Sequence, residues 1–218
     1  MRTGPDFTEE HVLADGLHVT LRHIRPSDAP ELRAGFHRLS PESRYRRFFR
    51  GITELTDEML RYLTEVDGVD HVAIVATGVS PDLKHEAGYG VARFVRRTDD
   101  PHVAEAAITV LDEMQHKGIG RILGMALAEA ALERGITHFR GEALASNTPV
   151  RQLLSEVGAE IKDESRSSMV FEIALREKED RPNESAVRRL IRAAAESAGE
   201  LLRGLTPSSE RKARDERS

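Results

Sequence analysis

Hydrophobic residues alternate with polar ones in several parts of the chain, and this period of two predicts strands. In HVTLRHI (18–24) valine, leucine and isoleucine alternate with polar side chains. The segments 71–77, 87–96 and 103–111 are rich in strand-forming residues and are separated by the turn-prone stretches SPDLKHE and RTDDPH. We therefore expect one strand near the N-terminus and three neighbouring antiparallel strands in the middle.

Three helices are expected between the first strand and the middle strands. Ser27 can cap a helix that runs to about Leu39, because its side-chain oxygen can accept an unpaired backbone N–H of the first turn. Ser40 and Pro41 repeat the pattern of a cap followed by proline at the first helical position, which starts PESRYRRFF. Thr56 opens a third helix, TDEMLRYLTEV, in which apolar residues recur at helical spacing.

The second half of the domain begins with a helical period of three and four. Apolar residues follow this spacing from Gly118 to Arg134, and Gly135 ends the run. The elements expected after it are a strand at 138–145, a helix that starts after Asn147 and stops at Gly158, and two strands at 159–163 and 168–175. A helix between two strands implies a mixed sheet, so we expect an α/β fold of the mixed α+β kind.

The composition changes after Leu175. A charged stretch, REKEDRPNES, leads to a segment whose apolar residues form one continuous helical stripe. That stripe needs a cover, and three alternatives stay open: its own domain, a second copy of the chain in a homodimer, or a foreign partner. The expected organisation is an N-terminal segment at 1–17, a domain at 18–175, a charged linker at 176–183, an amphipathic helix at 184–204 and a disordered tail at 205–218.

Composition and charge narrow the classes of function. The chain has 218 residues, 39% of them hydrophobic, which is enough to build one domain with a core. The formal net charge is −5 with both signs interspersed, so nothing supports a nucleic-acid-coating or membrane-surface role. There are no cysteines, and His85, His102 and His116 lack partners at metal-site spacing, so we expect no metal. The polar N-terminus shows no leader, which predicts a cytoplasmic protein.

A glycine pair marks the clearest candidate binding site. In QHKGIGRILG (115–124), Gly118 and Gly120 lie where a helix should begin. A helix start exposes unpaired N–H groups and the positive end of the helix dipole, which favours an anion such as a diphosphate. Glycines let the main chain approach the phosphate oxygens, and Lys117 and Arg121 can add charge at the rim. Glycines at this spacing also fit an ordinary strand-to-helix turn, and the Rossmann pattern fails because position 123 is leucine.

The residues around this pair resemble a known family. VLDEMQHKGIGRIL matches the Gln/Arg-x-x-Gly-x-Gly/Ala signature of the GNAT superfamily of N-acetyltransferases, with Gln115, Gly118 and Gly120 at the defining positions. The order of predicted elements over about 18–175 is similar as well. Within the superfamily, PESRYRRFF, LRYLTEVDGVDHVAIVA and VAEAAITV resemble bacterial protein lysine acetyltransferases that modify acyl-CoA synthetases, including those fused to a cyclic-nucleotide-binding domain.

This resemblance implies a GNAT fold, a central mixed, mostly antiparallel sheet flanked by helices, with acetyl-CoA as cosubstrate. In the superfamily, the strand before the signature pairs with the pantetheine arm, the following amides hold the diphosphate, and an asparagine after the next strand lies near the arm. The matching positions here are Ile108, Thr109, Val110, Gln115, His116, Lys117, Gly118, Ile119, Gly120, Arg121 and Asn147.

Glu105 is the candidate catalytic base. It is an acid in the middle of the apolar strand HVAEAAITVL, and it matches the family's catalytic glutamate. Without the resemblance, a solvent-facing glutamate on a half-buried sheet explains it equally well. The family's usual general acid, a tyrosine, is replaced by Leu154, so no general acid is assigned. His71 follows an aspartate and either lines the cleft or is a structural histidine.

The expected function is transfer of an acetyl group from acetyl-CoA to a lysine side chain of a protein, for which the resemblance implies an acyl-CoA synthetase as a target. Two alternatives stay open: acetylation of a small amine such as a polyamine or aminoglycoside, and a CoA-binding regulatory module without turnover. The arginines and aromatics of RYRRFFR (44–50) could touch RNA, but a helix with solvated arginines is the better interpretation in a net acidic chain. We expect no nucleic acid or membrane as a partner.

Overall fold

Eight strands form one sheet in the part of the chain that the computed structural model describes, which is residues 2–48, 52–79, 86–145, 151, 159–166 and 168–175. Their order across the sheet is β1-β2-β3-β4-β5-β6-β8-β7, and only the β5–β6 pair is parallel. The strands are β1 (Thr8–Val12), β2 (His18–His23), β3 (His71–Val79), β4 (Glu86–Arg96), β5 (Val103–Val110), β6 (His138–Leu144), β7 (Glu160–Glu164) and β8 (Ser168–Ala174).

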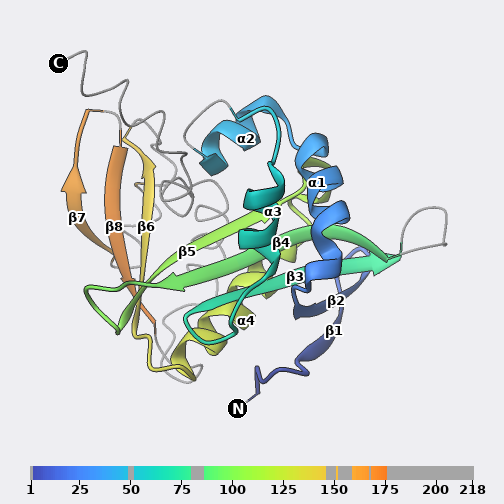
Figure 1. The fold of residues 1–218 in the computed structure, drawn as a ribbon, viewed down its shortest axis with the longest axis horizontal. Helices are drawn as coiled ribbons and strands as arrows, with labels where there is room; N and C mark the ends of the chain where they lie inside the picture. The colour runs from blue at the N-terminus through green and yellow to red at the C-terminus, as the bar shows by residue number, and fades with distance from the viewer. Residues whose placement is uncertain are drawn as a thin grey trace.

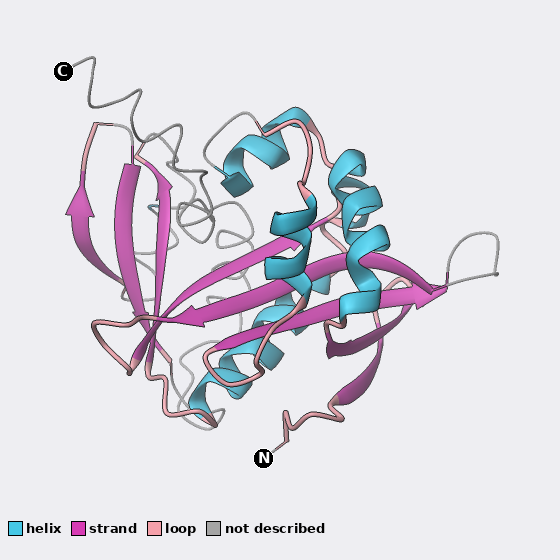
Figure 2. Cartoon of the chain, in the orientation of Figure 1, coloured by secondary structure: helices cyan, strands magenta, loops and turns pink. Residues whose placement is uncertain are grey.

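Helices cover both faces of this sheet (Figure 1, Figure 2). Two short 3₁₀ turns, η1 (Pro26–Asp28) and η2 (Asp112–Met114), precede α1 and follow β5. The α-helices are α1 (Ala29–Arg38), α2 (Pro41–Phe48), α3 (Asp57–Thr64) and α4 (Ile119–Leu132). In the view of Figure 1, α1 and α3 lie in front of the central strands and α4 lies behind them. The mixed sheet between helical layers has the architecture expected from the sequence.

The strand predictions are confirmed, and one strand was not predicted. The middle strands β3, β4 and β5 are neighbours and antiparallel. The missed strand is β1, which lies inside the segment assigned to residues 1–17 and pairs with β2. Its signal is the Asp15-Gly16 turn between two short apolar runs, a typical hairpin sequence, and Gly16 has the positive φ of 81° that such a turn requires.

Two of the three helix caps are confirmed. The backbone N–H of Ser43 donates to Ser40 Oγ at 3.1 Å, and the N–H of Met59 donates to Thr56 Oγ1 at 3.2 Å. The predicted helix cap at Ser27 is wrong, because residues 26–28 form a separate 3₁₀ turn and α1 begins only after Asp28.

Helix α4 supplies the main cover of the sheet's rear face. Its predicted apolar stripe is confirmed, since these residues are all buried: Ile119, Ile122, Leu123, Ala126, Leu127, Ala130 and Ala131. They pack on β3, β4 and β5. Burial of a leucine side chain contributes roughly 1.5–3 kcal/mol, so α4 is held firmly and its N-terminus has a fixed position at the end of β5.

Strands β5 and β6 run together for only a short distance. Their parallel pairing covers Val103–Glu105 of β5 and 138–140 of β6. From Gly141 on, β6 pairs with β8, and Figure 1 shows β5 and β6 diverging from a common start. Within the described residues no strand pairs with β5 on this side beyond Glu105, so its second half presents an open edge.

Several expectations fall outside the described residues. These are the helix after Asn147, the linker at 176–183, the amphipathic helix at 184–204 and the tail at 205–218. No helix in the described part of the chain is long and apolar enough to cross a bilayer.

Candidate active site

A left-handed loop leads from η2 into α4. His116 has φ of 63° and Gly118, which caps the helix, has φ of 96°. Glycine adopts this conformation without strain, which explains its presence at position 118. The N–H of Ile122 makes the helical bond to the Gly118 carbonyl at 3.2 Å, so the amides before it remain available at the positive end of α4.

This loop and the start of α4 line a cavity of about 650 Å³, within the size range of cofactor sites. Nine of the eleven positions expected to contact the cofactor line it: Thr109, Val110, Gln115, His116, Lys117, Gly118, Ile119, Gly120 and Arg121. The remaining two differ. Ile108 is buried in the core against α4, so only its main chain can contribute, and Asn147 lies outside the described residues.

Side-chain hydrogen bonds fix the loop to its surroundings. Gln115 Nε2 donates to the Val110 carbonyl at 3.3 Å, which ties the loop to the end of β5. Asp112 accepts from Ser43 Oγ at 2.6 Å and from the Ser40 N–H at 2.8 Å, so it joins the N-terminus of α2 to η2. Burial acts to raise the pKa of Asp112, but these hydrogen bonds outweigh it and the pKa is lowered. The charged carboxylate is therefore a stable anchor at neutral pH.

The β1–β2 hairpin forms a wall of the cavity that sequence reasoning missed. Residues 11–14 line it, and Asp15 in the following turn accepts a 2.7 Å hydrogen bond from Lys117 Nζ. This bond, the largest cause, lowers the pKa of Asp15. Lys117 was expected to offer its charge at the rim, and here that charge is shared with an exposed carboxylate.

The open edge of β5 presents main-chain groups toward the gap left by β6. The N–H of Leu111 donates to the Tyr89 carbonyl on the β4 side at 3.0 Å. Main-chain directions alternate along a strand, so the N–H groups of Val110 and Ile108 face the opposite, open edge. The Gln115 bond to the Val110 carbonyl agrees with this direction.

Glu105 lies at the point where β5 and β6 separate, because its pairing with Arg140 is the last of the parallel ladder. Its side chain is about three-quarters buried and accepts a 2.9 Å bond from Arg97 Nη1. Arg97 also holds Asp99 at 2.7 Å. Glu105 shares a strand face with Thr109, and four residues of extended chain separate their Cα atoms by about 13 Å.

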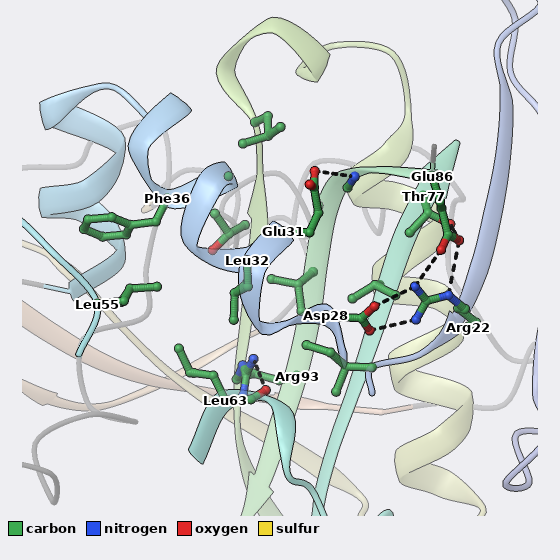
Figure 3. Close-up of a pocket in the computed structure, with 18 of the residues that line it drawn as sticks. Arg22, Asp28, Glu31, Leu32, Phe36, Leu55, Leu63, Thr77, Glu86 and Arg93 are labelled. Carbon is green, nitrogen blue, oxygen red and sulfur yellow. Dashed lines mark hydrogen bonds and ion pairs between the residues drawn. The ribbon is translucent and has the colours of Figure 1, made fainter. Parts of the chain in front are cut away.

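A second cavity, of about 370 Å³, lies between the front face of the sheet and helices α1 and α3 (Figure 3). Its walls are mainly apolar and include Leu32, Phe36, Leu55 and Leu63. Thr109 lines both cavities, and its hydroxyl oxygen is buried without a hydrogen-bond partner. Thr109 is therefore a wall residue that the two cavities share.

Carboxylates gather at one end of this second cavity. Arg22 binds Asp28 at 2.8 Å and Glu86 at 2.9 Å, as Figure 3 shows. Hydrogen bonds from Arg22 lower the pKa of Glu86; for Asp28 burial opposes the same effect but is outweighed. Glu31 Oε1 accepts from the Gly88 N–H at 3.0 Å and lies 3.9 Å from Arg38. Three carboxylates against Arg22 and the more distant Arg38 give this end a small excess of negative charge.

A buried arginine lies at the other end. Arg93 is 1% exposed; its Nη2 donates to the Leu63 carbonyl at 3.0 Å and its Nη1 lies 3.1 Å from His71 Nε2. Burial, followed by the charge of Arg93, lowers the pKa of His71 to about 4, so this histidine is neutral and accepts the bond. His71 also packs against the Tyr62 ring and lines neither cavity, which supports a structural role.

The described residues hold no group of three or more histidine, aspartate or glutamate side chains that could bind a metal ion. Leu154, at the position of the usual general acid, lies outside them. The chemistry that the described site supports is therefore binding of an extended, phosphate-bearing ligand along an open strand edge and a helix start, beside a separate acceptor cavity.

Known proteins match this arrangement. The family model described as acetyltransferase (GNAT) domain matches residues 18–160. Acetyltransferase Pat from Mycolicibacterium smegmatis is 35% identical over 141 residues, which are 64% of this chain and 40% of that protein. The chain thus spans about two-fifths of the length of this relative.

Solved structures agree. The GNAT domain of S. lividans PAT has a TM-score of 0.67 and 28% identity, and the match covers 77% of this chain and 97% of that one. The putative acetyltransferase yncA from Salmonella typhimurium, solved with its cofactor acetyl-CoA, has a TM-score of 0.54 at 15% identity over 76% of this chain and 98% of that one. The second likeness concerns the fold alone.

Proposed function

Because the chain belongs to the GNAT family of acetyltransferases, we propose that it transfers the acetyl group of acetyl-CoA to a lysine side chain of a protein, with an acyl-CoA synthetase as the expected target. The observation that carries this proposal is that the two cavities lie on either side of one residue, Thr109, which lines both. One has the features of a nucleotide-linked cofactor site, and the other can receive an acceptor. The likeness to Acetyltransferase Pat supports acetyl transfer, and the resemblance of the motif segments to protein lysine acetyltransferases supports the protein substrate.

Each part of the cofactor has a proposed contact. The diphosphate lies on the amides between His116 and Arg121, where the helix dipole favours negative charge. The pantetheine arm follows the open edge of β5 in place of a paired strand. The N–H groups of Ile108 and Val110 face that edge and stabilise the oxyanion that forms when the amine attacks the thioester.

Glu105 is proposed to remove the proton from the amine. A lysine amine has a reference pKa near 10.4, so freeing it at neutral pH costs roughly 4–5 kcal/mol. Glu105 lies too far along the strand from Thr109 for direct contact with a nitrogen at the thioester, so the proton passes through water. The nitrogen bonds to the acetyl carbon, the carbon–sulfur bond breaks, and the thiolate leaves and takes up a proton from solvent.

The test compares Glu105→Gln with Asp99→Asn. Both changes remove a carboxylate bound to Arg97, but only the first removes the proposed base. We expect Glu105→Gln to bind CoA normally in calorimetry and to transfer acetyl roughly 100- to 10,000-fold more slowly, while Asp99→Asn stays close to the wild type. Equal activity of the two variants would remove Glu105 from the mechanism.

The target is tested by mass spectrometry of cell lysate incubated with the protein and isotopically labelled acetyl-CoA. Labelled lysines on a defined set of proteins support the proposal. Acetylation of small amines with no labelled protein would reject the protein version.

A further inference from the structure

The second cavity contains a charge that the proposed function does not use. Arg93 has no carboxylate partner among the residues that the structure describes, and its Nε is buried without a hydrogen-bond acceptor. Among the described residues, its hydrogen-bond contacts are the Leu63 carbonyl and the neutral His71 ring. A guanidinium in this position is desolvated but only partly satisfied, and an anion in the cavity would complete its hydrogen bonds once the side chains that cover the 1% exposed Arg93 move aside.

The cation persists at neutral pH despite its burial. Desolvation lowers the pKa of Arg93, but only to about 10, so the side chain stays charged. In Figure 3, Arg93 lies beside Leu63, well apart from the Arg22 cluster with Asp28 and Glu86. Those carboxylates are engaged by Arg22 and cannot serve Arg93 as partners.

The cavity is therefore polarised along its length. One end carries the buried cation, the other end carries the excess of carboxylates, and the walls include aliphatic side chains such as Ile24, Val75 and Val91. A matching ligand has an acidic group, an aliphatic body and an amine. At about 370 Å³ the cavity suits a small molecule rather than a folded partner.

The register of the sheet sets the span of such a ligand. Arg93 pairs with Ala107 and Val91 pairs with Thr109, so Arg93 and Thr109 are diagonal neighbours about 7–8 Å apart at the backbone. The guanidinium extends further, to Leu63 and His71. The acidic group and the reacting amine must therefore lie at opposite ends of a chain of several carbons, as the carboxylate and the side-chain amine of lysine do.

We propose that this cavity also takes free lysine, or a closely related basic amino acid, as a second acceptor, with the carboxylate bound by Arg93 and the side-chain amine directed to Thr109. The inference rests on the proposed function for the position of the thioester. The reaction is the same as the transfer to a protein lysine. The side-chain nitrogen gains the acetyl group, CoA leaves as the thiol, and the amine proton passes to water and Glu105.

L-lysine and cadaverine test this, because cadaverine is the same carbon chain with two amines and no carboxylate. Calorimetry without CoA should show the wild type binding lysine about 10- to 100-fold more tightly than cadaverine, the range expected for a charge-assisted hydrogen bond. Arg93→Met should remove the preference, since an apolar side chain of similar size often replaces a buried charge without loss of folding. Arg93→Lys keeps a charge and should retain part of the preference even if the methionine variant folds poorly.

The control is Arg96→Gln on the same strand, which removes an arginine paired with Asp70 outside the cavity and should leave the preference intact. Mass spectrometry with acetyl-CoA should then detect lysine acetylated on its side chain. Equal binding of the two probes, a preference that survives Arg93→Met, or binding of lysine without its acetylation would each overturn the inference. The proposed function fails separately, through absent CoA binding or absent protein acetylation.

Discussion

Substituting alanine at Gly118 tests the phosphate-binding loop directly. Gly118 has φ of 96°, and a Cβ added there meets no atom within 4 Å. Alanine would therefore add no clash and only the cost of the left-handed conformation, about 1–2 kcal/mol. The free loop can relieve this strain by shifting, and CoA binding must restore the original geometry. Up to the whole cost should then appear in the dissociation constant, as a weakening of about 5- to 30-fold.

The chain contains a matched control at the other end of the same helix. Gly135 has φ of 74°, ends α4, and also has no atom within 4 Å of an added Cβ. Gly135→Ala should therefore lower the free energy of unfolding by the same 1–2 kcal/mol or so.

Urea denaturation and CoA calorimetry on both variants separate the two effects. Gly135→Ala should lose stability and keep its CoA affinity, whereas Gly118→Ala should lose CoA affinity and less stability than Gly135→Ala. If Gly118→Ala binds CoA as the wild type does while its stability falls, the left-handed turn is a folding device and does not shape the cofactor cradle.

Two further predictions concern charge. Burial, then Arg93, lowers the pKa of His71 from 6.5 to about 4, so the unfolded chain takes up a proton first as pH falls. The part of the free energy of unfolding that depends on a neutral His71 is complete above pH 6.5 and should be lost between pH 6.5 and 4, by up to about 3 kcal/mol. Urea unfolding across this range should show that the free energy of unfolding of His71→Gln depends less steeply on pH. A dependence as steep as that of the wild type would contradict the assignment. Asp15→Asn frees Lys117 from an exposed ion pair, so calorimetry should show slightly tighter CoA binding, and weaker binding would mean that Asp15 supports the site instead.

Local patterns determined much of this protein. The apolar stripe of α4 is visible in the sequence because a helix brings residues three and four apart onto one face, and all its predicted members are buried. The glycine pair before it is readable for the same reason, since a left-handed turn and a helix start depend on a few consecutive residues. The Asp15-Gly16 hairpin was equally local, and its strand was missed although the signal was present.

Other local signals pointed the wrong way because tertiary contacts compete with them. Ser27 has the chemistry of a helix cap, but it lies within the 3₁₀ turn that ends at Asp28. The Asp28 side chain binds Arg22 and the Arg25 N–H. Arg22 lies on β2, six residues before Asp28, and it also binds Glu86 on β4, so part of what fixes this region comes from a strand that is distant in the sequence.

The sequence by itself determined most of the described elements, the signature loop and the family, because each rests on residues close together in the chain. Only the tertiary structure decided that β6 leaves β5 after Glu105, that the β1–β2 hairpin closes the cofactor cavity, and that two cavities share Thr109. The burial of Arg93 belongs with these, since alternation places it on a strand face but α3 and β3 provide its contacts. Such features depend on pairing between distant segments, and no window along the chain contains them.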